Sequence, residues 1–170
     1  MRLAILTASD KGAAGQRDDT SGAAIRAAAE TAGHAVTQTA IVPDDRRRIA
    51  DVLAAWADEG IADLIVTTGG TGLGPRDVTP EATRDVAERD VPGIPVALAL
   101  EGLKHTPYAV LSRGIAVTRG RTLIVNLPGN PRAVAEGMTV LLPLLDHIGR
   151  VLSGPLEHAG AADTGHAGER

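Results

Sequence analysis

The chain has 170 residues and a formal net charge of −4 at pH 7, which suits one domain with a sizeable core and argues against general nucleic-acid binding. Apolar residues make up 44% of it but aromatic residues only 1%, so the core must be aliphatic, with Trp56 and Tyr108 as isolated rings. The absence of cysteine excludes disulfides, thiolate metal sites and thiol nucleophiles. The chain opens on a short apolar run rather than a signal peptide, and no stretch approaches the roughly 20 apolar residues of a membrane span. We therefore expect a soluble cytoplasmic protein that binds neither nucleic acid nor a membrane.

The first half of the chain alternates between strand-like and helix-like patterns. Apolar runs at 3–6, 35–42 and 64–68 predict buried strands, and helical spacing at 20–32 and 45–59 predicts the helices between them. Strands that alternate with helices in this way form a parallel sheet with the helices packed on it. We therefore expect an α/β fold with a mostly parallel sheet in a single domain.

The second half adds a strand at 122–127, which we expect to pair with a short strand at 115–117. Thr79 and Pro80 are typical of a helix start, with Thr79 as the N-cap and Pro80 in the first helical position. A further helix is expected at about 96–105.

Asn130 and Pro131 repeat this pattern of a cap followed by proline, and the last predicted helix runs from there to about His147. We expect a kink or break at Pro143 because proline lacks the backbone N–H that a helix needs. Its apolar surface is wider than one sheet face requires, which favours a subunit contact; burial in the chain's own core is the alternative. From Ser153 onward Gly, Ala, His and charged residues dominate, so we expect a domain at 1–152 and a disordered tail at 153–170.

The stretch TTGGTGLGPRDVTPEAT at 67–83 places four glycines directly after a predicted strand. Ligands of α/β sheets bind beyond the carboxyl ends of the strands, and glycines let backbone N–H groups approach a phosphate closely. A Walker loop needs Gly-Lys-Ser/Thr, whereas Gly74 is followed here by Pro75 and Arg76, and the dinucleotide fingerprint needs other spacing after the first strand. We therefore predict a phosphate-binding loop of another kind; the alternative is an ordinary turn, for which one glycine would suffice.

Several motifs together resemble one known family. The strongest are TTGGTGLGPRDVTPEAT at 67–83, LKHTPYAVLSRG at 103–114 and LIVNLPGNPRAVAE at 123–136, supported in the same order along the chain by TASDKG at 7–12, DTSG at 19–22 and IVPDD at 41–45. They resemble the molybdopterin adenylyltransferases, the Mog/MoaB-type family of molybdenum-cofactor biosynthesis that includes the G domain of gephyrin-like and plant proteins. The resemblance covers about residues 2–150, and it is specific because separate motifs agree.

The resemblance implies a three-layer α/β/α sandwich that assembles as a homotrimer. It also implies an enzyme in which the terminal phosphate of molybdopterin attacks the α-phosphate of ATP, giving adenylated molybdopterin and pyrophosphate. Magnesium (Mg²⁺) would support the transfer, and a separate molybdate-inserting protein would receive the product. Two alternatives stay open: hydrolysis of pyrophosphate bonds in nucleotides, and a non-catalytic molybdopterin-binding or scaffolding protein of MoaB type.

Two aspartates are the candidate catalytic and metal-binding residues. Asp77 lies between the glycines and the next helix, where a carboxylate can hold Mg²⁺ against a triphosphate. If Thr79 caps that helix, Asp77 is not needed as its cap. Asp44 follows the second strand, and the resemblance makes it catalytic or metal-linked, with Asp45 as the cap of the helix that follows.

The remaining candidate residues are expected to bind substrate or nucleotide, and the resemblance places them in four segments. They are Ser9 and Asp10; Gly69, Gly70, Thr71, Gly72 and Arg76; Ser112 and Arg113; and Pro128, Gly129 and Asn130.

Arg46, Arg47 and Arg48 oppose the dipole of the helix that they begin, at about 0.3–1 kcal/mol each. We hypothesise that one of them reaches an anionic substrate beside Asp44; an ordinary solvated surface is the alternative. No His, Asp or Glu residues have zinc-like spacing, so zinc is not expected.

Overall fold

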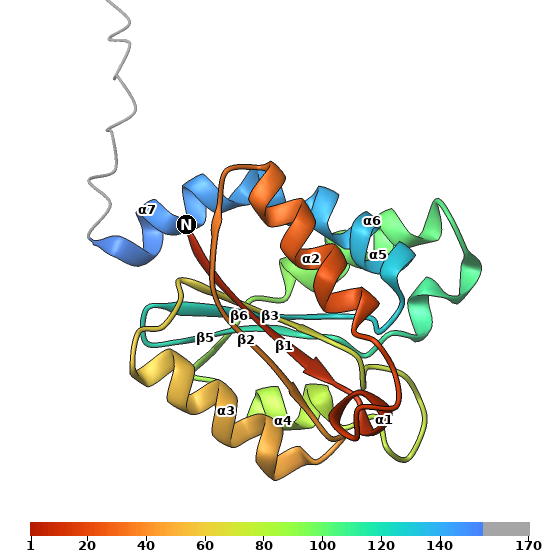
Figure 1. The fold of residues 1–170 in the computed structure, drawn as a ribbon. Helices are drawn as coiled ribbons and strands as arrows, with labels where there is room; N and C mark the ends of the chain where they lie inside the picture. The colour runs from red at the N-terminus through yellow and green to blue at the C-terminus, as the bar shows by residue number, and fades with distance from the viewer. Residues whose placement is uncertain (155–170) are drawn as a thin grey trace, which may run out of the picture.

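The structure is a computed structural model that describes residues 1–154, and its strands form one sheet (Figure 1). The strands are β1 (Arg2–Ala8), β2 (Ala35–Val42), β3 (Leu64–Thr68), β4 (Arg89–Asp90), β5 (Ala116–Arg119) and β6 (Thr122–Leu127). Their order across the sheet is β2-β1-β3-β6-β5-β4. Strands β1, β2, β3 and β6 run parallel, whereas β5 is antiparallel to β6 and β4 to β5. The predicted mostly parallel sheet is confirmed.

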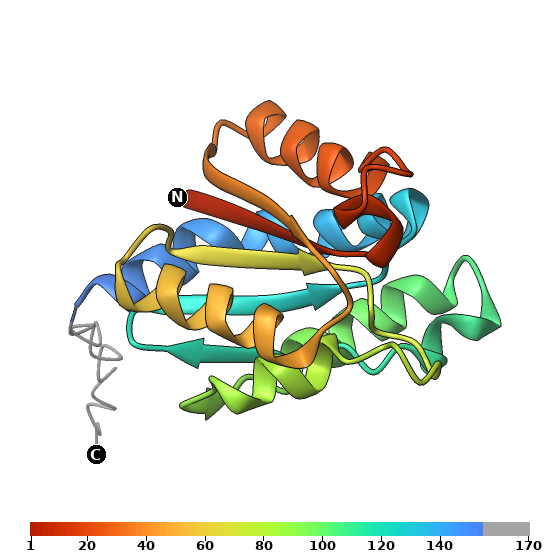
Figure 2. The same ribbon diagram turned by 60° about the horizontal axis from the view of Figure 1, so that its bottom comes forward.

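Helices cover both faces of this sheet. They are α1 (Asp10–Ala13), α2 (Thr20–Thr31), α3 (Arg46–Asp58), α4 (Thr79–Asp85), α5 (Gly93–Leu103), η1 (Pro107–Leu111), α6 (Pro131–Leu141), η2 (Leu142–Leu144) and α7 (Leu145–Ser153). One face is packed around Ile25 of α2 and Met138 of α6, and the other around Ile49 and Leu53 of α3. Figure 2 shows the sheet between the two helix layers, which confirms the three-layer sandwich.

The core is aliphatic, as the composition predicts. Trp56 is buried, whereas Tyr108 is 74% exposed. The apolar side chains of the last helical region lie in this core: Val134, Met138, Leu141 and Leu145 are all fully or almost fully buried. Much of that apolar surface therefore packs on the sheet, as the alternative expected, whereas Leu144 remains 40% exposed; the subunit contact stays a prediction.

The predicted break at Pro143 is confirmed. Helix α6 ends at Leu141, Pro143 lies in the short η2, and α7 resumes the helix and includes Ser153. The predicted tail therefore begins one residue inside a helix, and its remainder, 155–170, lies outside the described residues.

Two of the three predicted helix caps are confirmed. Asp45 accepts a hydrogen bond from the backbone N–H of Arg48 (2.8 Å), and Asn130 accepts one from that of Arg132 (2.9 Å). The prediction for Thr79 is wrong: it lies inside α4, after Val78, and its hydroxyl caps nothing. The physical reason is that the Thr79 backbone N–H donates to the carbonyl of Gly70 (3.1 Å), which draws this residue beneath the glycine loop.

The topology places a crevice at the carboxyl end of the sheet. Helix α2 leads from β1 to the edge strand β2 over one face, and α3 returns over the other face to β3, on the far side of β1. Chain connections that leave neighbouring strands over opposite faces open a binding crevice beyond the strand ends. None of the helices in the described part of the chain is long and apolar enough to span a bilayer.

Candidate active site

The carboxyl ends of β1, β3 and β6 lie side by side, with Thr7 opposite Thr68 and Thr68 opposite Leu127. A hollow of about 250 Å³ opens there, which we call the inner hollow. The ends of β1 and β3, the start of α2 and the loops that follow four different strands line it. The lining includes Thr7, Ser9, Arg17, Asp18, Asp19, Thr20, Ser21, Asp44, Thr68, Gly69, Gly70, Asp77 and Gly129.

A second and larger hollow, the outer hollow, has a volume of about 660 Å³ and lies against α5, η1 and α6. Its lining is more apolar and includes Leu73, Pro95, Leu98, Ala99, Tyr108, Leu111, Ser112, Asn130 and Glu136. The inner and outer hollows share Gly70, Asp77 and Gly129. Two ligands, one in each hollow, would therefore meet at these shared residues.

Two glycines between the hollows adopt backbone conformations that other residues avoid. Gly69 and Gly70 have φ values of +92° and +63°, in the left-handed region. A Cβ at Gly69 would overlap the carbonyl oxygen of Ala8, and one at Gly70 would overlap the Thr79 hydroxyl. The turn after β3 therefore requires glycine at both positions, which explains part of the glycine-rich sequence.

Asp77 lies at the junction of the hollows. Its Oδ2 accepts a hydrogen bond from the backbone N–H of Gly74 (2.8 Å), so the loop itself orients the carboxylate. A Cβ at Gly72 or at Gly74 would approach Oδ2 to 2.9 or 2.8 Å. The two further glycines thus leave room for this side chain.

Asp44 and Asp10 hold each other through paired hydrogen bonds. The Asp10 N–H donates to Asp44 Oδ2 (2.9 Å), and the Asp44 N–H donates to Asp10 Oδ1 (3.0 Å). Burial raises the pKa of Asp44; the hydrogen bond from Asp10 opposes this, and the negative charge of Asp77 adds to it. Arg76 donates to both carboxylate oxygens of Asp10 and lowers the pKa of that residue.

Asp44 and Asp77 fit a magnesium ion shared with a substrate. Mg²⁺ is usually held by one or two carboxylates together with substrate phosphates. Both residues line the inner hollow, and Oδ1 of each has no donor among residues 1–154. The described residues contain no group of three or more His, Cys, Asp or Glu that could enclose a metal by themselves.

Comparison with known proteins identifies the fold and the motifs around these hollows. A family model described as "Probable molybdopterin binding domain" matches residues 4–147. The chain belongs to this molybdopterin-binding family. A crystal structure of the molybdopterin biosynthesis enzyme MoaB from Thermus thermophilus superposes with a TM-score of 0.84 at 49% identity, covering 91% of this chain and 97% of that one.

Curated relatives place the family in molybdenum cofactor biosynthesis. A molybdopterin adenylyltransferase of Helicobacter pylori strain J99 is 37% identical over 152 residues, which cover 86% of this chain and 85% of the relative. The molybdenum cofactor synthesis protein cinnamon of Drosophila melanogaster is 43% identical over 144 residues and 84% of this chain. The chain spans only 24% of cinnamon's length.

The family motifs bring most of the predicted site residues to the two hollows. Ser9 lines the inner hollow, and its hydroxyl accepts a hydrogen bond from the N–H of Gly12 (3.1 Å). The carbonyl of Pro128 accepts from Thr68 Oγ1 (2.7 Å), and that of Gly129 accepts from Ser21 Oγ (3.0 Å). These turns are therefore held by the protein itself, and their binding roles stay predictions.

The two predicted binding arginines have protein partners. Arg76 is paired with Asp10, and the guanidinium of Arg113 is directed to the backbone of the glycine loop and to Glu81. Arg113 does not line either hollow in the described structure, whereas Ser112 lines the outer one.

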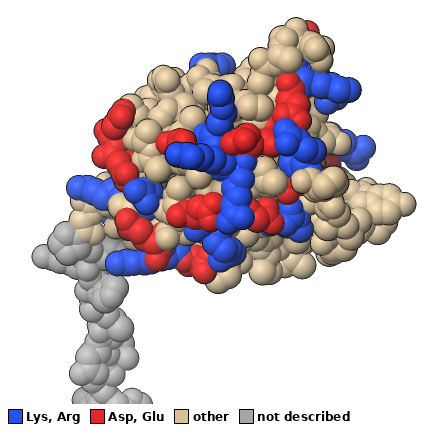
Figure 3. Space-filling model, turned by 90° about the horizontal axis from the view of Figure 1, so that it is seen from below, with Lys and Arg blue, Asp and Glu red and all other residues tan. Residues whose placement is uncertain are grey.

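The structure does not support the hypothesis that the run Arg46–Arg48 reaches a substrate. Nε and Nη2 of Arg46 donate to the two carboxylate oxygens of Asp85 (2.7 Å each). The Arg47 guanidinium lies 3.9 Å from the Asp51 carboxylate. None of the three arginines lines either hollow of the described structure. Figure 3 shows that cations and carboxylates are interleaved over the α3 and α4 face, so this run belongs to a solvated surface.

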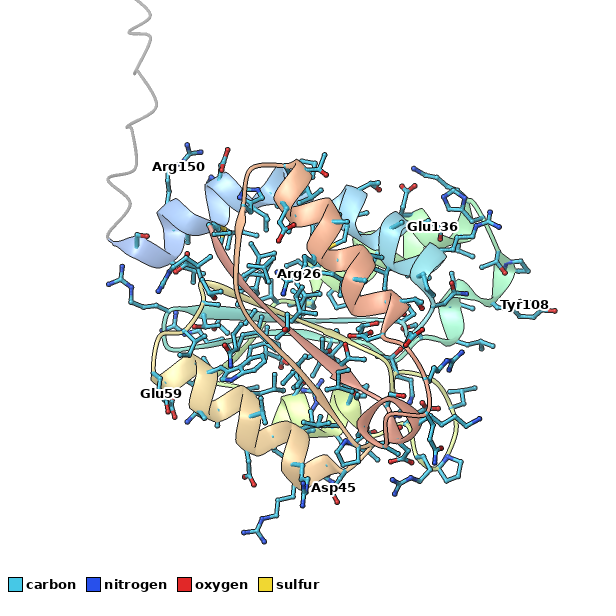
Figure 4. The ribbon with its side chains drawn as sticks, in the orientation of Figure 1. Arg26, Asp45, Glu59, Tyr108, Glu136 and Arg150 are labelled. Atoms are coloured by element: carbon cyan, nitrogen blue, oxygen red, sulfur yellow. The ribbon has the colours of Figure 1, made fainter. Side chains whose placement is uncertain are left out.

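Sequence reasoning missed several residues of the inner hollow. Asp19 is the clearest: it caps α2 through the N–H of Gly22 (2.8 Å) and accepts from the Thr7 hydroxyl (2.7 Å). The DTSG motif was the available signal, but only the fold shows that Asp19 and Arg17 line the same hollow as Asp44 and Asp77. The outer hollow was missed as well, because α5 and η1 supply much of its lining and no predicted site residue lies on either helix. Tyr108 of η1 belongs to this lining, and Figure 4 shows its side chain projecting outward.

Proposed function

We propose that this chain is a molybdopterin adenylyltransferase. A phosphate oxygen of molybdopterin forms a bond to the α-phosphorus of ATP, the bond from that phosphorus to the bridging oxygen of the β-phosphate breaks, and pyrophosphate leaves. The observation that carries the proposal is that two hollows of different character meet at Gly70, Asp77 and Gly129. A two-substrate transfer needs two binding places that bring the reacting atoms together.

The described residues supply the groups that such a transfer requires. The attacking phosphate is largely ionised near neutral pH, so the protein need not remove a proton from it. The glycine loop offers backbone N–H groups at a close approach to the phosphates. Asp44 and Asp77 would hold Mg²⁺, whose chemistry is to neutralise charge on the phosphate oxygens as it develops.

The chain would assemble as a homotrimer and pass its product to a second protein. The resemblance to the family suggests a homotrimer. Exposed apolar side chains of the glycine loop, α5 and η1 would suit a contact between subunits: Leu73, Val96, Leu100, Leu103, Tyr108, Val110 and Leu111. Light scattering at several protein concentrations measures the number of subunits. A separate molybdate-inserting protein would receive the adenylated product.

Pyrophosphate release from Mg-ATP, with and without molybdopterin, tests the reaction. We expect release that depends on molybdopterin and that falls about 100- to 1000-fold in Asp77→Asn, because that variant loses one of the two carboxylates that would hold Mg²⁺ against the phosphates. Asp51→Asn is the control: this side chain is 71% exposed on α3 and should leave the rate unchanged.

The other outcomes separate the alternatives. Release that is independent of molybdopterin would indicate hydrolysis of nucleotide pyrophosphate bonds. Tight molybdopterin binding with no release would place the chain among non-catalytic binding or scaffolding proteins, and the proposed transfer would be wrong.

A further inference from the structure

Arg113 lies outside the glycine loop but forms several hydrogen bonds with its backbone. Arg113 lies between η1 and β5. Its backbone N–H donates to the carbonyl of Thr71 (2.9 Å), its Nε to that of Gly72 (2.7 Å) and its Nη2 to that of Asp77 (2.6 Å). A single residue therefore joins the two ends of segment 71–77.

The same guanidinium forms an ion pair with a carboxylate on α4, the helix that follows the glycine loop. Nη1 of Arg113 forms an ion pair with Glu81 in the first turns of α4, and the two side chains are 34% and 37% exposed. Arg113 lowers the pKa of Glu81 through this hydrogen bond, which favours the ionised form of that carboxylate. The loop, the start of α4 and the start of β5 are thus tied together at one point.

Arginine suits this position because its planar fork presents five donors in fixed directions. Lysine would keep the positive charge but could not reach two carbonyls and a carboxylate in these directions at once. Segment 71–77 needs such a support because it has few other backbone hydrogen bonds to the described residues. Apart from those with Arg113, the backbone–backbone bond found in it is from the Asp77 N–H to the carbonyl of Gly74 (3.0 Å).

We propose that Arg113 is a positioning residue that holds the glycine loop so that the Asp77 carboxylate faces both hollows. This role replaces the substrate contact predicted from the sequence, and its link to turnover depends on the proposed adenylyl transfer. Arg113 binds the Asp77 carbonyl, while Gly74 in the same loop binds the Asp77 carboxylate (2.8 Å). A shift of the loop would therefore move the carboxylate directly, and a misplacement of about 1 Å can reduce a rate about 100-fold.

The test compares Arg113→Ala and Arg113→Lys with Arg119→Ala. Arg119 is the matched control, since it also binds one carboxylate (Asp58, 2.7 Å) and one carbonyl (Val86, 3.2 Å) but lies at the opposite end of β5. The first readout is hydrogen exchange of the amides in segment 69–78, which needs no turnover. We expect faster exchange there in both Arg113 variants and unchanged exchange in Arg119→Ala.

The second readout is the rate of pyrophosphate release. For both Arg113 variants we expect kcat to fall about 100-fold with the KM for molybdopterin changed less than about threefold, and Arg119→Ala to keep its rate. Added guanidinium ion at millimolar concentration should restore part of the rate to Arg113→Ala only, because it can refill the site among the carbonyls and Glu81.

The two readouts separate failure of the inference from failure of the proposed function. Normal exchange in the loop of the Arg113 variants, together with a raised KM and a retained rate in Arg113→Lys, would overturn the positioning role in favour of a charge contact with substrate. If the wild type releases no pyrophosphate, the proposed function fails, and loop exchange alone then decides whether Arg113 holds the loop. Should Arg113→Ala not fold, Arg113→Lys carries both readouts.

Discussion

The two ends of the sheet are built differently. At the end away from the hollows, Arg2 is paired with Asp63 (2.7 Å) and binds the carbonyl of Gly60 (2.9 Å), and Arg119 is paired in the same manner. At the end with the hollows, burial raises the pKa of Asp44, and the buried Thr79 hydroxyl has no partner among the described residues. At the far end these polar groups have partners, whereas the end with the hollows keeps a carboxylate whose ionised form is disfavoured and a buried hydroxyl without a hydrogen bond in the described part of the chain.

This difference indicates where the molecule gives up stability for function. Polar groups left unsatisfied in a native structure, and residues in unfavourable backbone conformations, are concentrated at functional sites in proteins generally. Variants at the two ends should therefore behave differently: variants that disturb the end with the hollows should affect activity, whereas variants at the far end should affect stability alone.

The largest expected effect comes from Gly69→Ala, with Gly60→Ala as its counterpart at the far end. Both glycines have positive φ (+92° and +63°), so alanine should cost each about 1–2 kcal/mol of unfolding free energy. Only at Gly69 would the new Cβ also overlap a backbone carbonyl, that of Ala8; at Gly60 it meets nothing within 4 Å. We expect Gly69→Ala to lose more stability and at least about tenfold in pyrophosphate release, measured beside urea unfolding. Equal losses in the two variants would remove the distinction between the ends.

A smaller effect, of opposite sign for stability, is expected from Asp44→Asn. Because the folded state raises the pKa of Asp44, it favours the neutral form, and the stability from this residue is lost as the pH rises through the folded pKa. Asparagine stays neutral and still accepts from the Asp10 N–H, so the variant should be more stable than wild type at neutral pH. The difference should shrink as the pH falls towards about 4, because wild-type Asp44 then takes up its proton more readily than an ordinary aspartate.

Urea unfolding at the two pH values measures this change. Asp45→Asn is the neighbouring control: both residue types cap helices equally well, so little change is expected at either pH. A loss of stability in Asp44→Asn at neutral pH would show that the Asp44 charge stabilises the fold.

The smallest effect expected is from Thr79→Val, paired with Thr83→Val on the same helix. Both threonines are fully buried, but Thr83 Oγ1 accepts from Asn126 Nδ2 (2.8 Å), whereas Thr79 Oγ1 has no partner within residues 1–154. Removing the Thr79 hydroxyl should raise the free energy of unfolding by about 1 kcal/mol, and removing that of Thr83 should lower it by about 1–2 kcal/mol. Thermal unfolding compares them, and a destabilised, less active Thr79→Val would instead assign the hydroxyl to a ligand.

Much of the fold could be predicted from local sequence. The bounds of β2, β3 and β6 agree with the prediction. Strands β3 and β6 are buried along their whole length, as expected for apolar runs in a parallel sheet. The prediction that 35–42 is a buried strand is wrong, because β2 lies at the edge of the sheet and most of its residues are exposed. Short elements were missed: β4 has two residues and α1 four, too few to show a period. The prediction of Thr79 as a cap was wrong because its backbone N–H bonds to the carbonyl of Gly70. Gly70 lies outside the few residues from which a cap is predicted, and this contact overrides the preference of threonine for the N-cap.

The fold class, the family motifs and the position of the glycine loop could all be inferred from the amino-acid sequence, because each depends on residues that are neighbours in the chain. The contacts of each polar side chain became known only from the folded structure. Arg113 and Arg76 were equivalent as cations in the sequence, yet one holds loop carbonyls and the other binds Asp10. Asp19, 58 residues from Asp77, lines the same hollow only because β1 and β3 pair in parallel. The direction of a side chain depends on segments that meet in space, and that information is not local to any motif.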